Sequence, residues 1–417
     1  MVTEGAAPGT GAHFSTGPSA CGRIAVVFPL PPLSAAQRDV IERIADLSRE
    51  RFAPRAARYD ADSSFPIENY ADLHRAGLLA LTVPKEYGGL GVDPVTYVHA
   101  LREMAKGCSA TALTFNMHAT VTTFLAALGT ESQKRRYFAD IVEHGKLIAS
   151  ITSEPDQSYR DTFVLTTVFR PVGNGSYHVA GVKHFCSIGD AADWYFVTGI
   201  VEGVRSAREG AITAMIPRGA GVKLEKPWNA NSMRGTISHA LRYDSVVDAS
   251  DVVGRPGQYL TIDLQGFALG YAAVYLGIGE AAFEYMVQYA KTRTLKPSTE
   301  PMSHHPLVQR TVAEVGTAIR AARLLVHEAA TVKMGDDRDA TMLAVNQAKT
   351  YCAEVGAMAT EKAMRMAGGS GILKDLPLER WHRDAQAGPV MPPSNDRCLE
   401  TAGKLLCGLR ASTLQFQ

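Results

Sequence analysis

The residues that could do chemistry in this chain do not fall into the short motifs that fix a mechanism. The sequence has no glycine-rich Walker loop, no G-x-G-x-x-G, no H-E-x-x-H and no G-x-S-x-G. Its one pair of adjacent histidines, His304 and His305, is expected on an extended loop, where neighbouring side chains point to opposite sides. That placement favours a solvated loop, and no metal site is predicted.

The elements that must position any functional residue divide the chain into three parts. Helical spacing begins at Ser34, which forms a capping-box pattern with Gln37, and weakens at Pro54. Further helical patterns cover about 66–80, 94–106, 109–128 and 131–144. β-branched and aromatic runs then predict short strands at 162–169, 177–185, 194–201, 211–216 and 241–247, with a hairpin signal at Gly173-Asn174-Gly175. Helical spacing returns at about 261–292, 306–334, 338–367 and 393–411.

These patterns predict an α+β multidomain protein. We expect a flexible lead at 1–33, a helical domain at 34–147, a β domain at 148–254 and a four-helix bundle at 255–417. Four long helices suit a bundle because antiparallel neighbours can each bury one apolar stripe.

Composition narrows the class of protein. The 417 residues include 43 Lys plus Arg and 42 Asp plus Glu, so the formal charge of +1 offers no footprint for nucleic acid. Six cysteines lie far apart without C-x-x-C spacing, as expected for reduced thiols. The longest apolar stretch, Phe267 to Gly279, is shorter than the roughly 20 residues of a membrane span. We expect a soluble, cytoplasmic protein without nucleic-acid or membrane partners.

Six ordered segments resemble one superfamily. They are Val83-Pro-Lys-Glu-Tyr-Gly-Gly89, Gly129-Thr-Glu-Ser-Gln-Lys134, Ser153-Glu-Pro155, Met233-Arg-Gly-Thr236, Gly368-Gly-Ser-Gly371 and Arg383-Asp-Ala385. Over about residues 34–412 the chain resembles the acyl-CoA dehydrogenase superfamily of flavoproteins. The resemblance implies that family's fold, with a helical domain, a middle β-barrel or sandwich domain and a four-helix bundle. It also implies a flavin, either FAD or reduced FMN or FAD supplied by a reductase, and a homodimer or homotetramer.

The same resemblance implies which residues hold the flavin. Ser153 and Ser187 would face the isoalloxazine ring, Ser187 near N5, and Phe185 stands where the family usually has a tryptophan. Arg293 resembles the arginine that binds the pyrophosphate, and Gly368-Gly369 would let the backbone approach the cofactor. Each residue also has a plain structural interpretation: a turn hydroxyl, a solvated helix-end arginine and a helix C-cap.

The sequence departs from the family at the catalytic base. In the dehydrogenases this base is a glutamate about nine residues after Arg-Asp-Ala, or a residue on the first bundle helix. These positions are Pro392 and Phe267 here, and neither side chain accepts a proton. Asp396 and Glu400 are the alternative bases, and Asp263 lies about one turn before Phe267. A helix-end or surface charge is the favoured interpretation of each of these carboxylates.

Two segments resemble instead the flavin-dependent monooxygenase branch, which includes dibenzothiophene monooxygenase. They are Lys183-His-Phe-Cys-Ser187 and Val274-Tyr-Leu-Gly-Ile278. In that branch reduced flavin reacts with O₂, which requires hydrogen-bond donors near N5 and a water-poor pocket. Ser187 and His118 could supply those contacts, and His118 is also interpreted as a buried core or substrate-wall histidine.

Three functions therefore stand as hypotheses. The first is a monooxygenase or oxidase acting on a small acyl, amine or heteroaromatic substrate, with a flavin reductase as a possible partner. The second is an acyl-CoA or acyl-carrier-protein dehydrogenase with a relocated base at Asp396 or Glu400. The third is a non-catalytic paralogue that keeps only the fold.

Overall fold

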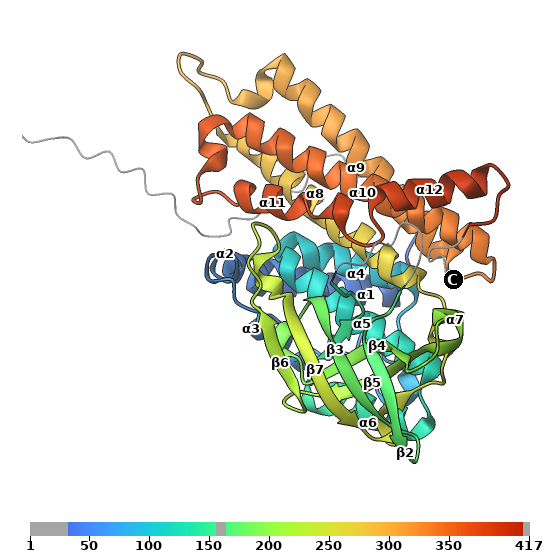
Figure 1. The fold of residues 1–417 in the computed structure, drawn as a ribbon. Coiled ribbons are helices and arrows are strands. Elements are labelled where there is room, and N and C mark those ends of the chain that lie inside the picture. Colours follow the sequence, from blue (N-terminus) through green and yellow to red (C-terminus); the bar gives the residue numbers. More distant parts are fainter. Residues whose placement is uncertain (1–31, 156–163, 412–417) are drawn as a thin grey trace, which may run out of the picture.

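The computed structural model describes residues 32–155 and 164–411. Its helical bundle lies on one side of the molecule and its sheet on the other, with helices of the first domain between them (Figure 1). Most of the predicted lead, residues 1–31, lies outside the described residues.

The first domain is helical, as its spacing predicts. Its helices are α1 (Ala35–Leu47), α2 (Ala53–Asp62), α3 (Ile67–Arg75), α4 (Pro94–Gly107), α5 (Ser109–Leu128) and α6 (Glu131–His144). The predicted capping box opens α1, because the Ser34 hydroxyl accepts from Gln37 N (3.2 Å) and Gln37 Oε1 accepts from Ser34 N (2.8 Å). Pro54 does not end the first helical run. A π-helical turn at Ser48–Phe52 leads into α2, and Pro54 occupies its first turn, where no intrahelical donor is required.

The described residues of the middle domain form an eight-stranded mixed sheet. Its strands are β1 (Ile148–Ile151), β2 (Val168–Gly173), β3 (Ser176–Cys186), β4 (Trp194–Val201), β5 (Ala211–Pro217), β6 (Val222–Lys226), β7 (His239–Val247) and β8 (Val252–Val253). They run in the order β6-β7-β3-β2-β4-β5-β8, and β1 pairs in parallel with β4. The predicted hairpin joins β2 to β3 through Gly173–Gly175. The strand predicted at 162–169 begins only at Val168, and residues 162–163 lie outside the described residues.

Within the described part of the last domain, up to residue 411, lie four long helices and one short helix. They are α8 (Gln265–Thr292), α9 (Pro306–Val332), α10 (Arg338–Ala367), α11 (Leu378–Ala385) and α12 (Asn395–Leu406). By length and composition α8 could cross a membrane, but its most apolar window is 83% buried inside the protein. Core packing therefore accounts for its apolar sequence.

Small residues and one amide let α8 approach the first domain closely. A Cβ on Gly270 would lie 1.8 Å from Asn116 Oδ1. That amide accepts from Tyr97 Oη (2.7 Å) and donates to the Phe267 carbonyl (3.1 Å). Glycine at position 270 is thus required by close approach between α5 and α8.

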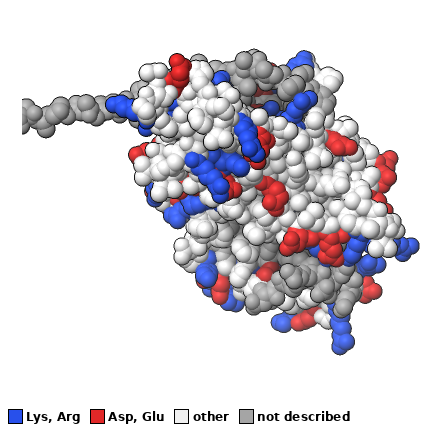
Figure 2. Space-filling view, turned by 90° about the horizontal axis from the view of Figure 1, so that it is seen from above, with Lys and Arg blue, Asp and Glu red and all other residues white. Residues whose placement is uncertain are grey.

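The surface and the cysteines agree with an ordinary neutral protein. On the face seen over the bundle, charges of both signs are interspersed around a broad uncharged area (Figure 2). Every cysteine that the structure describes is free, namely Cys108, Cys186, Cys352, Cys398 and Cys407.

Candidate functional site

The segment after β3 forms a strained turn in the β domain. Phe185 (φ +53°) and Ile188 (φ +76°) adopt left-handed backbone conformations, as do Met233 (φ +51°) and Ile237 (φ +39°) on the facing segment. These are four of the six non-glycine residues with positive φ in the described chain. Such conformations cost about 1–3 kcal/mol each, are outliers for isoleucine, and cluster at functional sites. The concentration of strain marks this turn as the candidate site.

The turn exposes an aromatic ring and buries a hydroxyl. Phe185 is 63% exposed, although it lies at the end of a strand, and its ring meets the Trp228 ring edge-on at 6.1 Å between centroids. Ser187 is buried, and its hydroxyl contacts the Ser238 hydroxyl at 2.9 Å. The hydroxyl of Ser238 in turn contacts Thr236 Oγ1 at 2.7 Å. The turn therefore combines an open apolar face with a hydroxyl chain behind it.

A buried ion pair holds the neighbouring loop against β3. Lys183 Nζ lies 2.6 Å from Glu154 Oε1, and both side chains are fully buried. Glu154 also accepts from the backbone amides of Thr166 (2.5 Å) and Thr167 (2.9 Å). Burial raises the carboxyl pKa, but the Lys183 charge and these donors outweigh it, so the pKa of Glu154 lies below its usual value.

The Glu154–Lys183 ion pair, called the clasp from here on, holds the adjacent Ser153 beside the strained turn. The Ser153 carbonyl accepts from His184 N at 2.9 Å, which joins the loop after β1 to the end of β3. Two of the sequence-predicted residues, Ser153 and Ser187, are therefore brought to one edge of the sheet with Phe185. The register shift between Lys183 and Cys186 in the β3–β7 pairing turns the end of β3 toward this edge.

All three domains meet at two further recognised segments. Asp384, on α11, accepts from Met233 N (2.6 Å) and from the Ser109 hydroxyl of α5. Arg383 makes a bidentate pair with Asp60 of α2 at 3.0 and 2.7 Å, and Arg234 Nε donates to the Asp60 carbonyl (2.7 Å). These contacts hold the segments 233–236 and 383–385, which both resemble the superfamily, next to each other and to α2.

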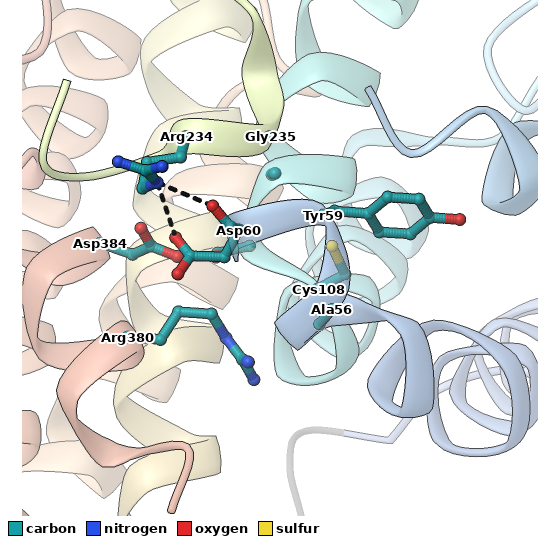
Figure 3. A pocket seen from close by; sticks show the side chains of 10 residues that line it. Ala56, Tyr59, Asp60, Cys108, Arg234, Gly235, Arg380 and Asp384 are labelled. Carbon is teal, nitrogen blue, oxygen red and sulfur yellow. Dashed lines mark hydrogen bonds and ion pairs between the residues drawn. The ribbon is translucent and has the colours of Figure 1, made fainter. Parts of the chain in front are cut away.

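A small pocket lies within this junction, lined by Asp60, Arg234, Arg380 and Asp384 among others (Figure 3). The volume open to water in this pocket is about 10 Å³, which holds a single water molecule and is far too small for a substrate. The junction fixes the domains relative to one another, and the candidate site remains at the strained turn.

Comparisons with known proteins agree with this architecture. The model described as acyl-CoA dehydrogenase, N-terminal domain, matches residues 34–144, and that of the C-terminal domain matches residues 260–396. Together they cover more than half of the chain. The chain belongs to the acyl-CoA dehydrogenase family.

Individual relatives of this acyl-CoA dehydrogenase family member carry different activities. An acyl-CoA dehydrogenase of Bacillus subtilis is 28% identical over 375 residues, which are 87% of this chain and 96% of that protein. Dibenzothiophene monooxygenase of Rhodococcus erythropolis is 27% identical over 402 residues, 90% of this chain and 95% of that protein. The solved structure of butyryl-CoA dehydrogenase from Megasphaera elsdenii aligns with a TM-score of 0.84 at 26% identity, covering 91% of this chain and 100% of that one.

This family member is a flavoprotein, and its own residues fit a flavin. The exposed Phe185 ring offers an apolar face for a planar ring system, and the buried Ser187 hydroxyl offers a polar contact beside it. At the C-terminal end of α10, Cβ atoms on Gly368 or Gly369 would meet nothing within 4 Å. Packing therefore does not require glycine there, although Gly368 (φ +60°) also caps α10.

The predicted cofactor residues form two separate groups within this chain. Ser153, Phe185 and Ser187 lie in the β domain, whereas Arg293 and Gly368-Gly369 lie at the exposed ends of α8 and α10 in the bundle. Among the described residues, no hydrogen bond or ion pair joins the two groups.

His118 occupies a structural position in this family member. It is fully buried on α5, and its Nδ1 accepts from Ile148 N of β1 at 3.1 Å. Burial lowers the pKa of His118 to about 4. The structure thus describes a neutral histidine that ties α5 to β1, and a catalytic contact for it stays a prediction.

The two base positions and the nearby carboxylates are also placed. Phe267 packs edge-on against Tyr271 (4.7 Å between centroids), and Pro392 precedes the start of α12. Glu400 is exposed and pairs with Arg397 (2.7 Å) and Lys404 (2.6 Å). Hydrogen bonding to Lys404 holds the pKa of Glu400 below its usual value.

The two remaining carboxylates are no better placed as bases. Asp396 is exposed in the first turn of α12. Asp263 pairs with Lys333 and accepts from Gln265 N (2.8 Å). None of the three nearby carboxylates is both buried and unpaired, as a base poised near neutral pH would be.

Lys349 is a buried residue that the sequence did not single out. Its Nζ donates to the Gly388 carbonyl (3.0 Å) and to Asn395 Oδ1 (2.9 Å), at either end of the segment that contains Pro392. Asn395 in turn donates to Glu354 Oε1 (2.7 Å). Burial lowers the pKa of Lys349 to about 8. A lysine in the middle of a helical pattern gives no signal of burial, so sequence reasoning could not find it.

Proposed function

We propose that this protein is a flavin-dependent oxidoreductase that uses oxygen, as a monooxygenase or oxidase, on a small acyl, amine or heteroaromatic substrate. The observation that carries this proposal is the state of the base positions. Phe267 and Pro392 occupy them, and the nearby carboxylates are exposed or paired with cations. Where a reductase supplies the reduced flavin, as for a monooxygenase, the transfer of its electrons to oxygen does not need a carboxylate to remove an α-proton from an acyl thioester.

The chain's own residues have defined parts in this proposal. Phe185 would pack against the flavin ring and Ser187 would contact its polar edge, while the Glu154–Lys183 ion pair keeps Ser153 near the same place. The bound flavin supplies the redox chemistry by passing two electrons to oxygen. The similarity to dibenzothiophene monooxygenase supports this function.

The assembly and partners belong to the same proposal. A homodimer or homotetramer would bring Arg293 and Gly368-Gly369 of one protomer to the β-domain face of another, which accounts for their separation within one chain. The flavin would be FAD, or reduced FMN or FAD delivered by a reductase in the cytoplasm. Analytical ultracentrifugation with and without added flavin measures the assembly.

The test begins with flavin binding. Purified protein is titrated with FAD and with FMN, and its visible spectrum is recorded. NADH and a flavin reductase are then supplied in air with candidate acyl, amine and heteroaromatic substrates, and products are analysed by mass spectrometry with ¹⁸O₂. Oxygen-dependent substrate oxidation supports the proposal. Binding of flavin without any oxygen-dependent product would refute the oxygen-using reaction, and failure to bind either flavin would favour the non-catalytic paralogue.

A second candidate function is an acyl thioester dehydrogenase acting on CoA or carrier-protein substrates. It is favoured by the similarity to the B. subtilis acyl-CoA dehydrogenase and by the Arg383-Asp-Ala385 segment, which resembles the dehydrogenases' Arg-Asp-Ala. Anaerobic bleaching of bound flavin by an acyl thioester would establish it. If Asp396→Asn or Glu400→Gln abolished that bleaching, the lost carboxylate would be the relocated base.

A further inference from the structure

A buried chain of three hydroxyl groups lies behind the strained turn. It runs from Ser187 through Ser238 (2.9 Å) to Thr236 (2.7 Å), whose hydroxyl donates to the Met233 carbonyl (2.8 Å). The three side chains are only 6%, 6% and 1% exposed. The Met233 carbonyl, where this row of hydroxyl groups ends, is held in position because it also accepts from Trp228 Nε1 at 3.1 Å.

The direction of this chain follows from counting hydrogens. A hydroxyl group has one hydrogen to donate and two lone pairs, and a carbonyl oxygen can only accept. Because Thr236 gives its hydrogen to Met233, Ser238 must donate to Thr236. Ser187 must then donate to Ser238, and its lone pairs remain to face the other way.

The backbone amides of the turn offer a ligand no hydrogen-bond donor either. Ser187 N already donates to the Phe185 carbonyl (2.8 Å), and Ile188 N donates to the Thr236 carbonyl (3.1 Å). These amides are therefore occupied inside the turn. Among the described residues, the Ser187 hydroxyl has Ser238 as its single partner, so what Ser187 offers to a ligand is an acceptor.

We propose that Ser238 and Thr236 are positioning residues that make the Ser187 hydroxyl a hydrogen-bond acceptor toward the flavin, so that the site favours the reduced form. The chemistry is a difference of one donor: reduced flavin carries an N–H at N5, where oxidised flavin has a lone pair. A hydrogen-bond acceptor beside N5 can bond the N–H of the reduced flavin, but it faces a lone pair in the oxidised flavin. The inference rests on the flavin site of the proposed function, and it replaces the expectation, drawn from the monooxygenase resemblance, that Ser187 supplies a hydrogen-bond donor near N5.

The experiment measures the affinity of both redox forms. Wild type, Ser238→Ala and Thr236→Val are titrated anaerobically with oxidised and with dithionite-reduced FAD and FMN. Ser238→Ala removes the acceptor of the Ser187 hydrogen, which can then point toward the flavin. Thr236→Val removes the acceptor of the Ser238 hydrogen, so Ser238 can donate to Ser187 and Ser187 can again donate toward the flavin. One hydrogen bond changes the ratio of reduced to oxidised Kd by about two- to tenfold, with reduced flavin weakened more. A tenfold change lowers the two-electron midpoint potential by about 30 mV.

Two controls separate positioning from general damage to the β domain. Thr213→Val removes a buried hydroxyl that also donates to a carbonyl, that of Val253 (2.8 Å), but lies on β5 away from the turn. It is expected to leave the Kd ratio unchanged. In a Ser187→Ala background, Ser238→Ala is expected to have no further effect on the ratio, because the chain acts through Ser187.

The outcomes are distinct. An unchanged ratio in both variants, or a greater loss of oxidised than of reduced flavin, overturns the proposed polarity. A full effect of Ser238→Ala in the Ser187→Ala background also overturns it, since the effect would not pass through Ser187. Failure of wild type to bind any flavin removes the flavin site itself and the inference with it, and is recognised before the variants are compared.

Discussion

Lys349 is a buried cation whose hydrogen-bond partners are neutral, and its cost to the fold can be measured through pH. The ordinary lysine pKa of 10.5 falls to about 8 here, chiefly through burial, with smaller opposing effects from Cys398 and Glu354. The difference corresponds to about 3 kcal/mol, at about 1.36 kcal/mol per pKa unit. The folded protein carries this cost while Lys349 is protonated.

The sign of the pH effect follows from proton counting. Below about pH 8 both the folded and unfolded states hold the proton, and the full cost is present. Between about pH 8 and 10.5 the unfolded chain keeps the proton while the folded chain has released it, so stability rises with pH. Between about pH 7 and pH 10 the wild type should therefore gain about 2.5 kcal/mol relative to Lys349→Met.

The assay compares pH profiles, because the absolute effect at neutral pH has two opposing parts. Lys349→Met removes the buried charge but leaves the Gly388 and Asn395 oxygens without a donor, at about 1–3 kcal/mol each. Urea unfolding of wild type, Lys349→Met and Lys349→Gln is followed by circular dichroism across this pH range, with exposed Lys374→Met as the matched control. A difference between wild type and Lys349→Met that stays constant within about 0.5 kcal/mol would refute the reasoning.

Three other outcomes follow from the described contacts. Glu154→Gln or Lys183→Met alone should lower the free energy of unfolding by about 3–5 kcal/mol, and the double variant should recover part of it in a thermal melt. Gly270→Ala should abolish soluble expression or cost several kcal/mol, whereas Gly403→Ala on α12, where a Cβ meets nothing within 4 Å, should change stability by less than about 1 kcal/mol. Phe185→Gly should raise the melting temperature of flavin-free protein and weaken flavin binding in a fluorescence titration; a lower melting temperature would contradict the strain at this position.

The sequence predicted the regular elements well where the periodicity was long. The helices at 94–107, 109–128, 131–144 and 338–367 lie within a residue of their predicted ends. The misses are short elements: β6 has five mostly exposed residues, β1 has four residues, and α11 has eight residues, too few to show a period. Local pattern carries little information over such lengths.

The candidate site was predicted only in part, for a physical reason. Ser153, Phe185 and Ser187 were identified through a resemblance, and the structure places them at one edge of the sheet. Ser238 was missed because its contact with Ser187 spans 51 residues of sequence and depends on the β3–β7 register shift. Thr236 lies in a segment that resembles the superfamily, but its bond to Ser238 was not predicted. No local pattern predicts a left-handed isoleucine such as Ile188, because tertiary contacts impose it.

The strain at the turn and the buried clasp beside it are best understood together. Four left-handed residues at about 1–3 kcal/mol each would relax unless the surrounding structure held them. The Glu154–Lys183 pair and the Ile188–Thr236 backbone bond lie on two sides of the turn and supply that restraint. A relaxed turn would let Phe185 fold onto the protein and would free Ser187 to rotate. The fold therefore maintains an exposed ring and a directed hydroxyl at a cost that packing alone would not select, which is the arrangement expected where a planar cofactor completes the site.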